Sequence, residues 1–222
     1  MESTTHPPVR LLVFGRQGAG KGTQAIRLAD HFGMPHISTG DMLRAAVREG
    51  TEFGQRAKEI MEAGHLVSDE VMLGLISERL SQPDAAHGWL LDGFPRTLQQ
   101  GKDLVALTGA DGIDLALDLD VAEEVVVERI SSRRVCSSCG ANYSVQVPPI
   151  SPWTCDSCGK EVTQRADDTE EAVRERLATY LRLTVPVVKW FEEQGLLVTV
   201  DGVGDRDQIT QELISMITDR LF

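Results

Sequence analysis

The chain has 222 residues, which is enough for one full core and an inserted subdomain. Its formal net charge is −12, and so acidic a surface would repel a phosphate backbone, which disfavours a protein that coats DNA or RNA. Residues 1–9 lack the pattern of a signal peptide and no run approaches the roughly 20 apolar residues of a membrane helix, so we expect a cytoplasmic protein with a loose tail at 1–8.

Strands and helices alternate along the chain, a pattern typical of an α/β fold with a parallel sheet. The expected strands are residues 9–14, 35–37, 89–91, 113–119 and 196–200. The expected helices are residues 21–32, 41–49, 52–63, 68–82, 97–107, 122–134, 170–194 (bent near Pro186) and 205–221. The segment 135–166 breaks this alternation with four cysteines and three prolines, and it predicts a small β-rich insert.

A glycine-rich loop, GRQGAGKGT at residues 15–23, follows the first expected strand and opens the first helix. Its glycines let successive N–H groups point at phosphate oxygens, and the helix N-terminus adds a positive dipole. The pattern matches G-x-x-x-x-G-K, in which the lysine, here Lys21, reaches the outer phosphates. Gly22 stands where Ser or Thr is usual, and Thr23 follows it. The context of strand, loop and helix favours a phosphate-binding loop over a chance glycine turn.

Two further segments indicate how a phosphate acceptor is bound. STGDMLR, residues 38–44, opens a helix with small capping residues and places Arg44 one turn inside it. DGFPR, residues 92–96, follows an apolar strand, and an acid such as Asp92 at a strand end beside a phosphate loop suits Mg²⁺ and its waters. Singly, Thr39 could be a helix cap, Asp92 a turn residue and Arg96 a surface charge. Together with the loop, they favour phosphoryl transfer.

The four cysteines form two C-x-x-C pairs separated by 15 residues: Cys136, Cys139, Cys155 and Cys158. This spacing matches a tetrathiolate zinc site. Two disulfides are the alternative, but nothing in the sequence indicates an oxidising compartment, and a redox C-x-x-C motif explains one pair rather than two. The sequence therefore predicts a structural Zn²⁺ site.

Arginine outnumbers lysine 17 to 5, and its planar fork binds phosphate at two points. Several arginines gather around the insert: Arg129, Arg133, Arg134, Arg165, Arg174 and Arg176. Arg129 and Arg133 are four residues apart, so they are expected to share a helix face, whereas Arg174 is expected to be an ordinary solvated charge.

The motifs GRQGAGKGT, STGDMLR, LLDGFPRT, ERISSRR and QRADDTEEAVRERL together resemble the adenylate kinase family, and within it the bacterial long form whose lid carries a zinc knuckle. The resemblance runs from about Val9 to the C-terminus. It implies a P-loop NTPase-like three-layer sandwich with a parallel five-stranded sheet, formed by residues 1–37, 68–131 and 169–222. It also implies a helical monophosphate-binding segment at 38–67 and a β-rich zinc lid at 132–168.

The resemblance implies a reversible, Mg²⁺-dependent reaction in which ATP and AMP give two ADP, in a monomer that binds neither nucleic acid nor a membrane. The implied ATP site comprises Gly18, Ala19, Gly20, Lys21, Gly22, Thr23, Arg129 (against the base), Arg133, Asn142, Tyr143 and the backbone of Gly204. The implied AMP site comprises Thr39, Arg44, His65, Leu66, Val67, Gly93, Phe94, Pro95, Arg96, Gln100, Arg165 and Arg176. The implied catalytic set comprises Lys21, Asp92, Arg96, Arg133, Arg165 and Arg176.

Within the implied AMP site, the base region would contact Thr39, Gln100 and the backbone of residues 65–67. Arg44 and Arg96 would hold the AMP phosphate, and Arg165 and Arg176 would bridge the transferring group.

Two positions depart from the family pattern. Gln17 stands where the family usually has proline, a change that would loosen the loop but removes no donor. Gly204 lies where some members have lysine, so only a backbone contact is expected there.

The expected chemistry needs no catalytic base, because the acceptor is itself a phosphate that is mostly dianionic at neutral pH. It needs cations around the transferring group and a lid that excludes water. The side chains of His31, His36 and His65 are therefore expected to have packing or surface roles.

Three alternative functions remain open at this point. A uridylate or cytidylate kinase would share the loop and DGFPR, but we expect it to have Ala at position 39 and a short lid. A nucleoside or sugar kinase would need an acidic base beside a hydroxyl acceptor. A zinc ribbon that binds nucleic acid should be basic with exposed aromatic residues, whereas residues 135–170 carry Asp156, Glu161, Asp167, Asp168 and Glu170.

Overall fold

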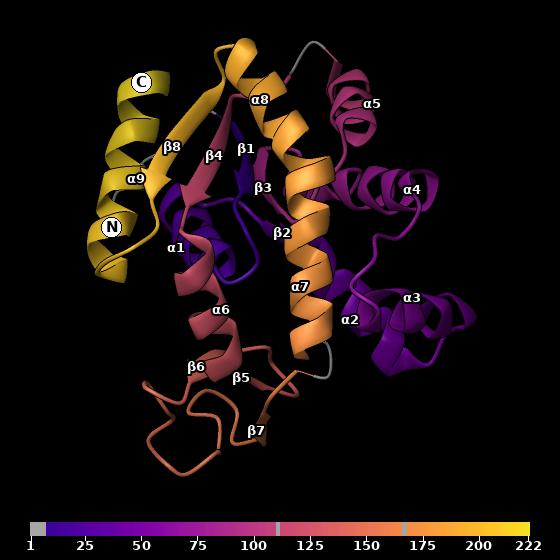
Figure 1. The fold of residues 1–222 in the computed structure, drawn as a ribbon. Coiled ribbons are helices and arrows are strands. Elements are labelled where there is room, and N and C mark those ends of the chain that lie inside the picture. The colour runs from indigo at the N-terminus through magenta and orange to yellow at the C-terminus, as the bar shows by residue number, and fades with distance from the viewer. Residues whose placement is uncertain (1–7, 110–111, 166–167) are drawn as a thin grey trace.

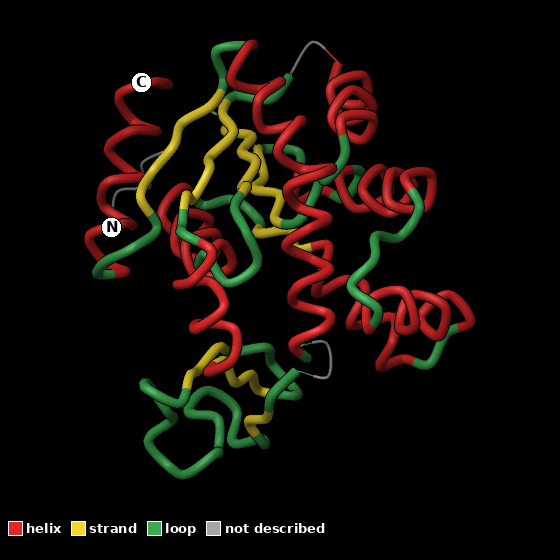
Figure 2. The backbone as a smooth tube through the Cα atoms, viewed as in Figure 1, coloured by secondary structure: helices red, strands yellow, loops and turns green. Residues whose placement is uncertain are grey.

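The computed structural model describes residues 8–109, 112–165 and 168–222, so the tail expected at residues 1–8 lies outside the described residues except for its last one. Five parallel strands form the central sheet in the order β2-β3-β1-β4-β8. They are β1 (Val9–Phe14), β2 (His36–Ser38), β3 (Gly88–Asp92), β4 (Leu115–Asp120) and β8 (Leu197–Asp201). Figure 2 shows this sheet inside the molecule with helices on both faces, which confirms the predicted α/β fold.

The side chains of each central strand pack on both faces of the sheet. Along β1, Leu11 and Val13 belong to one buried cluster, and Leu12 and Phe14 belong to the other, because successive side chains of a strand point to opposite faces. The first cluster includes residues of α1 (Lys21–Phe32), α6 (Glu123–Ser132) and α9 (Arg206–Leu221). The second includes residues of α4 (Asp69–Leu80), α5 (Leu98–Thr108) and α8 (Val185–Glu193). A 3₁₀ turn, Pro83–Ala85, follows α4.

Two helices, α2 (Thr39–Glu49) and α3 (Glu52–Glu62), project from the core beyond β2 (Figure 1). They pack so closely that a Cβ atom on Gly54 would lie 2.0 Å from the carbonyl oxygen of Ala46. Both helices match the expected ranges within two residues.

A second, antiparallel sheet of three strands forms the small module drawn below α6 and α7 in Figure 1. Its strands are β5 (Arg133–Cys136), β6 (Asn142–Ser144) and β7 (Val162–Thr163), in the order β6-β5-β7.

The sequence predicted a helix through residue 134, and that prediction is wrong. Helix α6 ends at Ser132, and Arg133 pairs with Ser144 in the sheet, so Arg129 and Arg133 do not share a helix face.

The long helix expected at residues 170–194 is interrupted earlier than predicted. Helix α7 (Glu170–Thr179) passes into a π-helical turn, Tyr180–Thr184, before α8 begins. The Val185 N–H donates to the carbonyl of Tyr180, five residues back. Pro186 has no N–H and its ring crowds the preceding turn, so the helix is disturbed on the N-terminal side of the proline.

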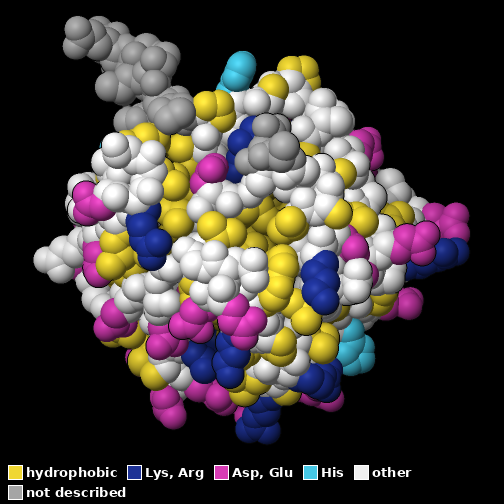
Figure 3. All heavy atoms as spheres, turned by 90° about the horizontal axis from the view of Figure 1, so that it is seen from above, with side chains coloured by type: hydrophobic (Ala, Val, Ile, Leu, Met, Phe, Trp, Pro, Cys, Tyr) yellow, Lys and Arg dark blue, Asp and Glu magenta, His cyan; other side chains and the backbone are white. Residues whose placement is uncertain are grey.

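On the face of the molecule opposite the small sheet, acidic and basic side chains are interspersed among apolar ones (Figure 3). Among the helices in the described part of the chain, none combines the length and the apolar character that a membrane span requires.

Candidate active site

The phosphate loop, residues 15–23, connects the carboxyl end of β1 to the first turn of α1. Gly15, Gly18 and Gly20 have φ values of 136°, 85° and 103°, which other residues rarely adopt. A Cβ on Gly18 would also lie 2.8 Å from Cγ1 of Ile130 on α6. The glycines therefore allow both the tight loop and its close contact with α6, as the motif predicted.

Lys21 is folded back over this loop. Its Nζ donates hydrogen bonds to the carbonyl oxygens of Gly15 and Arg16, each at 2.8 Å. Burial lowers the pKa of Lys21 to about 8, against the opposing effect of the Asp92 charge. A phosphate bound in the loop would place a negative charge directly beside this ammonium group, which here donates to neutral carbonyl oxygens.

Asp92 ends β3, the neighbour of β1, and faces the loop: a Cβ on Gly22 would lie 3.6 Å from its Oδ2. Burial alone would raise the pKa of Asp92, but the contact with His36 and the charges of Lys21 and Arg96 outweigh it and hold the pKa below its ordinary value. An ionised carboxylate is the kind of oxygen ligand that Mg²⁺ prefers. His36, expected to have only a packing or surface role, lies with Nε2 3.6 Å from Asp92 Oδ2.

The predicted acceptor residues lie across the cavity from the loop. Thr39 is buried at the start of α2 and its hydroxyl donates to the carbonyl oxygen of Asp92 at 3.3 Å. Arg44, one turn further, pairs with Asp41 at 2.6 Å. Arg176 on α7 donates to the carbonyl oxygen of Met61 at 2.8 Å, which ties α7 to α3.

A buried network holds Arg96. Its Nε donates to the carbonyl oxygen of Gly93 at 2.7 Å, and its backbone N–H donates to Oε1 of Gln100 at 2.7 Å. The Gln100 amide in turn donates to Asp69 at 2.7 Å, and Thr184 in the π-helical turn donates to the Arg96 carbonyl at 3.0 Å. Gln100 is thus engaged in positioning Arg96, and its predicted contact with a base stays a prediction. No motif in the sequence indicated Asp69 or Thr184.

From the small sheet, Arg133 reaches the cavity and forms two hydrogen bonds with the carboxylate of Asp168, from Nε at 2.9 Å and from Nη2. Asp168 is fully buried. Gln17 of the phosphate loop donates to the same carboxylate at 3.2 Å. On the other side of the loop, Arg129 donates to the carbonyl oxygens of Ala19 and Gly202 at 3.3 and 3.0 Å.

A cavity of about 1000 Å³ brings together most of the predicted site. It is lined by all twelve residues of the predicted AMP site and by Asp92, Gly18, Gly20, Lys21, Gly22, Thr23, Arg129, Arg133, Asn142 and Tyr143. The other two predicted residues, Ala19 and Gly204, line a neighbouring cavity of about 320 Å³, which also contacts Arg129 and the phosphate loop. The loop therefore separates two spaces, of which the larger reaches the acceptor residues.

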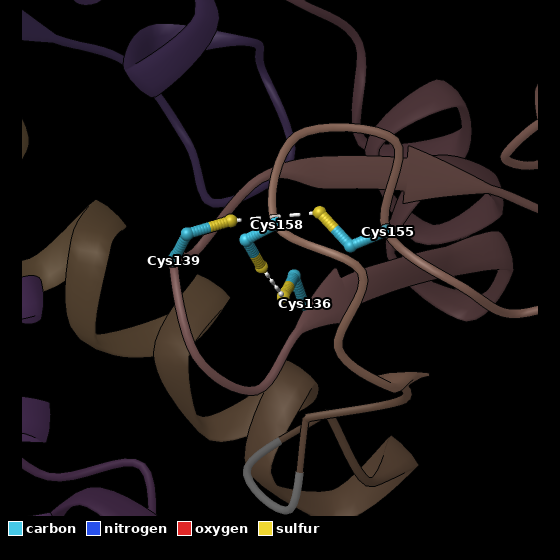
Figure 4. Close-up of side chains that lie close together, drawn as sticks. All are labelled: Cys136, Cys139, Cys155 and Cys158. Atoms are coloured by element: carbon cyan, nitrogen blue, oxygen red, sulfur yellow. Dashed lines mark hydrogen bonds between the residues drawn. The ribbon is translucent and has the colours of Figure 1, made fainter.

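The four cysteines converge at one point (Figure 4). Their sulfur atoms all lie within 4.8 Å of one another, and all four are free thiols. The distances from Cys136 to Cys158 and from Cys139 to Cys155 are 3.4 and 3.5 Å, near the separation of about 3.8 Å that Zn–S bonds of about 2.3 Å give around a tetrahedron. This arrangement fits Zn²⁺ and does not support the disulfide alternative.

Tyr143 connects this cluster to the cavity. Its hydroxyl donates to the Cys155 sulfur at 3.4 Å and accepts from the Asp156 N–H at 2.9 Å. The hydrogen bond from Tyr143 lowers the pKa of the Cys155 thiol to about 6, which favours the thiolate that binds metals. Tyr143 is thus held by the cysteine cluster while it lines the cavity.

Comparison with known proteins gives a consistent result. The family model described as adenylate kinase matches residues 13–196. The adenylate kinase of Kosmotoga olearia is 48% identical over 208 residues, covering 92% of this chain and 97% of that protein. The adenylate kinase of Methanosarcina barkeri is 47% identical over 212 residues, covering 94% and 98%. That of Moorella thermoacetica is 46% identical over 197 residues, covering 87% and 91%. The similarity therefore extends over the phosphate loop, the acceptor residues and the cysteine module alike.

Proposed function

The chain belongs to the adenylate kinase family, and we propose that its large cavity is where this enzyme passes a phosphoryl group reversibly between ATP and AMP to give two ADP. The observation that carries this assignment is the convergence of cations from separate elements on one cavity. Lys21 enters from the phosphate loop, Arg96 from the end of β3, and Arg133 from the small sheet. Each nucleotide substrate then has its own cationic phosphate site.

In the proposed arrangement, ATP binds with its phosphates in the loop formed by Gly18 to Thr23. Arg129, Asn142, Tyr143 and the backbone of Gly204 complete that site. AMP binds on the opposite side, with its phosphate between Arg44 and Arg96. Its base lies near Thr39 and the backbone of residues 65–67.

The proposed mechanism depends on positioning and on charge. Phosphoryl transfer passes through a loose transition state in which negative charge is spread over the equatorial oxygens of the transferring group. Lys21, Arg133, Arg165 and Arg176 surround the place where that charge develops, so they stabilise the transition state more than the ground state. The attacking phosphate is already ionised at neutral pH, so no side chain has to remove a proton. Closure of the lid, residues 132–168, keeps out water that would otherwise hydrolyse ATP.

We propose two metal ions with different roles. Asp92 would hold Mg²⁺ through its waters, and the ion would neutralise charge on the ATP phosphates. A structural Zn²⁺ would be held by Cys136, Cys139, Cys155 and Cys158, since four thiolates leave no open position for substrate.

The structural role of the Zn²⁺ is tested by Cys136→Ser. This replacement should abolish metal binding, measured by atomic emission, and lower the Tm, while part of the kinase activity survives at low temperature. Complete loss of turnover with an unchanged melting curve would contradict the structural role.

We also propose that one copy of the chain carries out the reaction in the cytoplasm. The predicted nucleotide-binding residues all line cavities within a single chain, which supports a reaction carried out by one copy. Sedimentation of the active enzyme should give a monomer of 24.3 kDa.

The assignment is tested by ADP formation from ATP with AMP, UMP, CMP and GMP in parallel. The Thr39 hydroxyl and the backbone of residues 65–67 present polar groups to the acceptor base, and polar sites discriminate strongly. AMP should be preferred over UMP and CMP by about 10²-fold or more in kcat/KM. Equal rates with UMP would instead indicate the uridylate or cytidylate alternative.

A further inference from the structure

Gln17 joins two parts of the molecule that are distant in sequence. It lies in the phosphate loop, and its side-chain amide donates to Oδ1 of Asp168, 151 residues away, at 3.2 Å. Its own Oε1 is buried and has no hydrogen-bond partner among the described residues. The bond to Asp168 is therefore what holds the amide in this orientation.

The Asp168 carboxylate is held by Arg133 and Gln17. Its side chain is 0% exposed, and its carboxylate accepts two hydrogen bonds from Arg133 in addition to the one from Gln17. A buried charge is tolerated when it is paired and hydrogen-bonded, and it is strongly destabilising once a partner is withdrawn. Arg133 supplies the charge that compensates Asp168, and Gln17 supplies a neutral donor.

The two hydrogen bonds to Asp168 use Nε and one hydrogen of Nη2, so Nη1 and the second hydrogen of Nη2 remain to donate to phosphate oxygens. In the proposed site, ATP therefore binds to this second edge of the guanidinium while Asp168 holds the first. Gln17 extends from the phosphate loop to the same carboxylate, so the loop that binds the ATP phosphates also helps to fix the pair of Asp168 and Arg133.

Resting on the proposed function, we infer that Gln17 is a positioning residue for ATP binding. It holds the Asp168 carboxylate, and through this carboxylate the guanidinium of Arg133, in one orientation beside the phosphate loop. Gln17 and Arg133 donate to the same oxygen, Oδ1, so loss of the Gln17 donor loosens this orientation and weakens ATP binding.

The effect should be specific to ATP. The cations of the proposed AMP phosphate site have other partners: Arg44 pairs with Asp41, and Arg96 donates to the Gly93 carbonyl. Neither of these bonds involves Gln17 or Asp168. A change confined to Gln17 should therefore leave AMP binding as it is.

The test is calorimetric titration of Gln17→Met with ATP alone and with AMP alone, since neither nucleotide turns over without the other. Methionine keeps the approximate size and removes the donor. We expect the Kd for ATP to rise by about 10-fold or more, as for loss of a hydrogen bond to a charged group, and the Kd for AMP to change by less than about twofold. Gln99→Met is the matched control, because Gln99 donates to Asp103 at 2.8 Å on the exposed face of α5.

A double-mutant cycle identifies the partner. Asp168→Asn removes the carboxylate through which Gln17 acts on Arg133, so Gln17→Met should have little further effect on ATP affinity in an Asp168→Asn background that melts cooperatively. An unchanged Kd for ATP in Gln17→Met, equal losses for ATP and AMP, or a full effect in the Asp168→Asn background would overturn the inference. If the wild-type enzyme nevertheless converts ATP and AMP to ADP, the proposed function stands and the role of Gln17 alone fails.

Discussion

Two groups of cations face the large cavity, and they are held by different kinds of partner. In the core, Lys21 and Arg96 donate to backbone carbonyl oxygens, those of Gly15 and Arg16 and that of Gly93. In the two segments that flank the core, Arg44 and Arg133 pair with the carboxylates of Asp41 and Asp168. A carbonyl carries no net charge, so a phosphate is the first anion to bind the core cations directly, whereas each flanking arginine has to share its donors between a carboxylate and a phosphate. The core is thus a preformed anion site, and the flanking arginines are oriented by carboxylates.

The largest effect is expected from a core cation. Lys21→Met should lower kcat/KM by about 10³-fold, because a preorganised charge beside the transferring group is lost. Its Tm should change little, because the loss of attraction between Lys21 and buried Asp92 is offset by the removal of a charge that burial disfavours. Steady-state kinetics and a melting curve on the same sample check both expectations. A large fall in Tm would show that Lys21 is structural and would break the comparison.

Replacement of a flanking cation should affect activity and stability together. Arg133→Ala should lower kcat/KM by about 10²-fold. It should also destabilise the fold by about 3–5 kcal/mol, because Asp168 is left buried without its counter-charge. The double variant Arg133→Ala with Asp168→Asn should recover most of the Tm but none of the lost activity. Recovery of activity in the double variant would show that Arg133 serves only to neutralise Asp168.

A smaller effect is expected from pH. Because the pKa of Lys21 in the folded protein is about 8, kcat/KM for ATP should fall about tenfold per pH unit above about pH 8. The unfolded chain keeps this lysine protonated up to its ordinary value of 10.5, so between these two values the unfolded state binds more protons. The contribution of Lys21 to stability therefore rises with pH in the window where activity falls.

Lys21→Arg provides the control for this pH profile, since a guanidinium stays charged throughout the range. Its activity will be lower, but the alkaline fall should disappear. An unchanged alkaline fall in Lys21→Arg would assign the titration to another group.

The smallest effect is expected at the exposed pair of the other flanking segment. Asp41 is 60% exposed and pairs with Arg44 three residues on, and such surface pairs contribute about 0–1 kcal/mol. Asp41→Ala should change KM for AMP by less than about threefold, in the direction of tighter binding. A tenfold change would mean that Asp41 positions Arg44 as firmly as Asp168 holds Arg133.

The sequence predicted best where local signals were strong. Strand β1 and helix α1 have the predicted limits, because the glycines of the phosphate loop separate an apolar run from an amphipathic one. The placement of Arg133 failed for the opposite reason: no glycine or proline lies between Ser132 and Gly140 to mark a boundary, and pairing with β6 ends the helix at Ser132. A tertiary contact thus overrode a continuous helical pattern.

The partners of the predicted site residues were less accessible to sequence reasoning than the residues themselves. A motif indicated Arg133 and the family resemblance implied Gln100, but neither indicated the carboxylates of Asp168 and Asp69 that hold them. Asp69 contacts Gln100 from 31 residues away and Asp168 contacts Gln17 from 151, and neither pair has a spacing that a local pattern can indicate. Gln17 was visible only as a departure from the family pattern, and its bond to Asp168 appears only in the fold.

The sharing of Arg133 between Asp168 and phosphate is tested most directly by a crystal structure of the enzyme with a bisubstrate analogue, in which ATP and AMP are joined through their phosphates. The account predicts that Lys21 and Arg96 contact phosphate oxygens and that Arg133 contacts them through Nη1 and Nη2 while it keeps its pair with Asp168, to which Gln17 still donates. Separation of Arg133 from Asp168, or an intact pair without any contact between Arg133 and the bound phosphate chain, would contradict it.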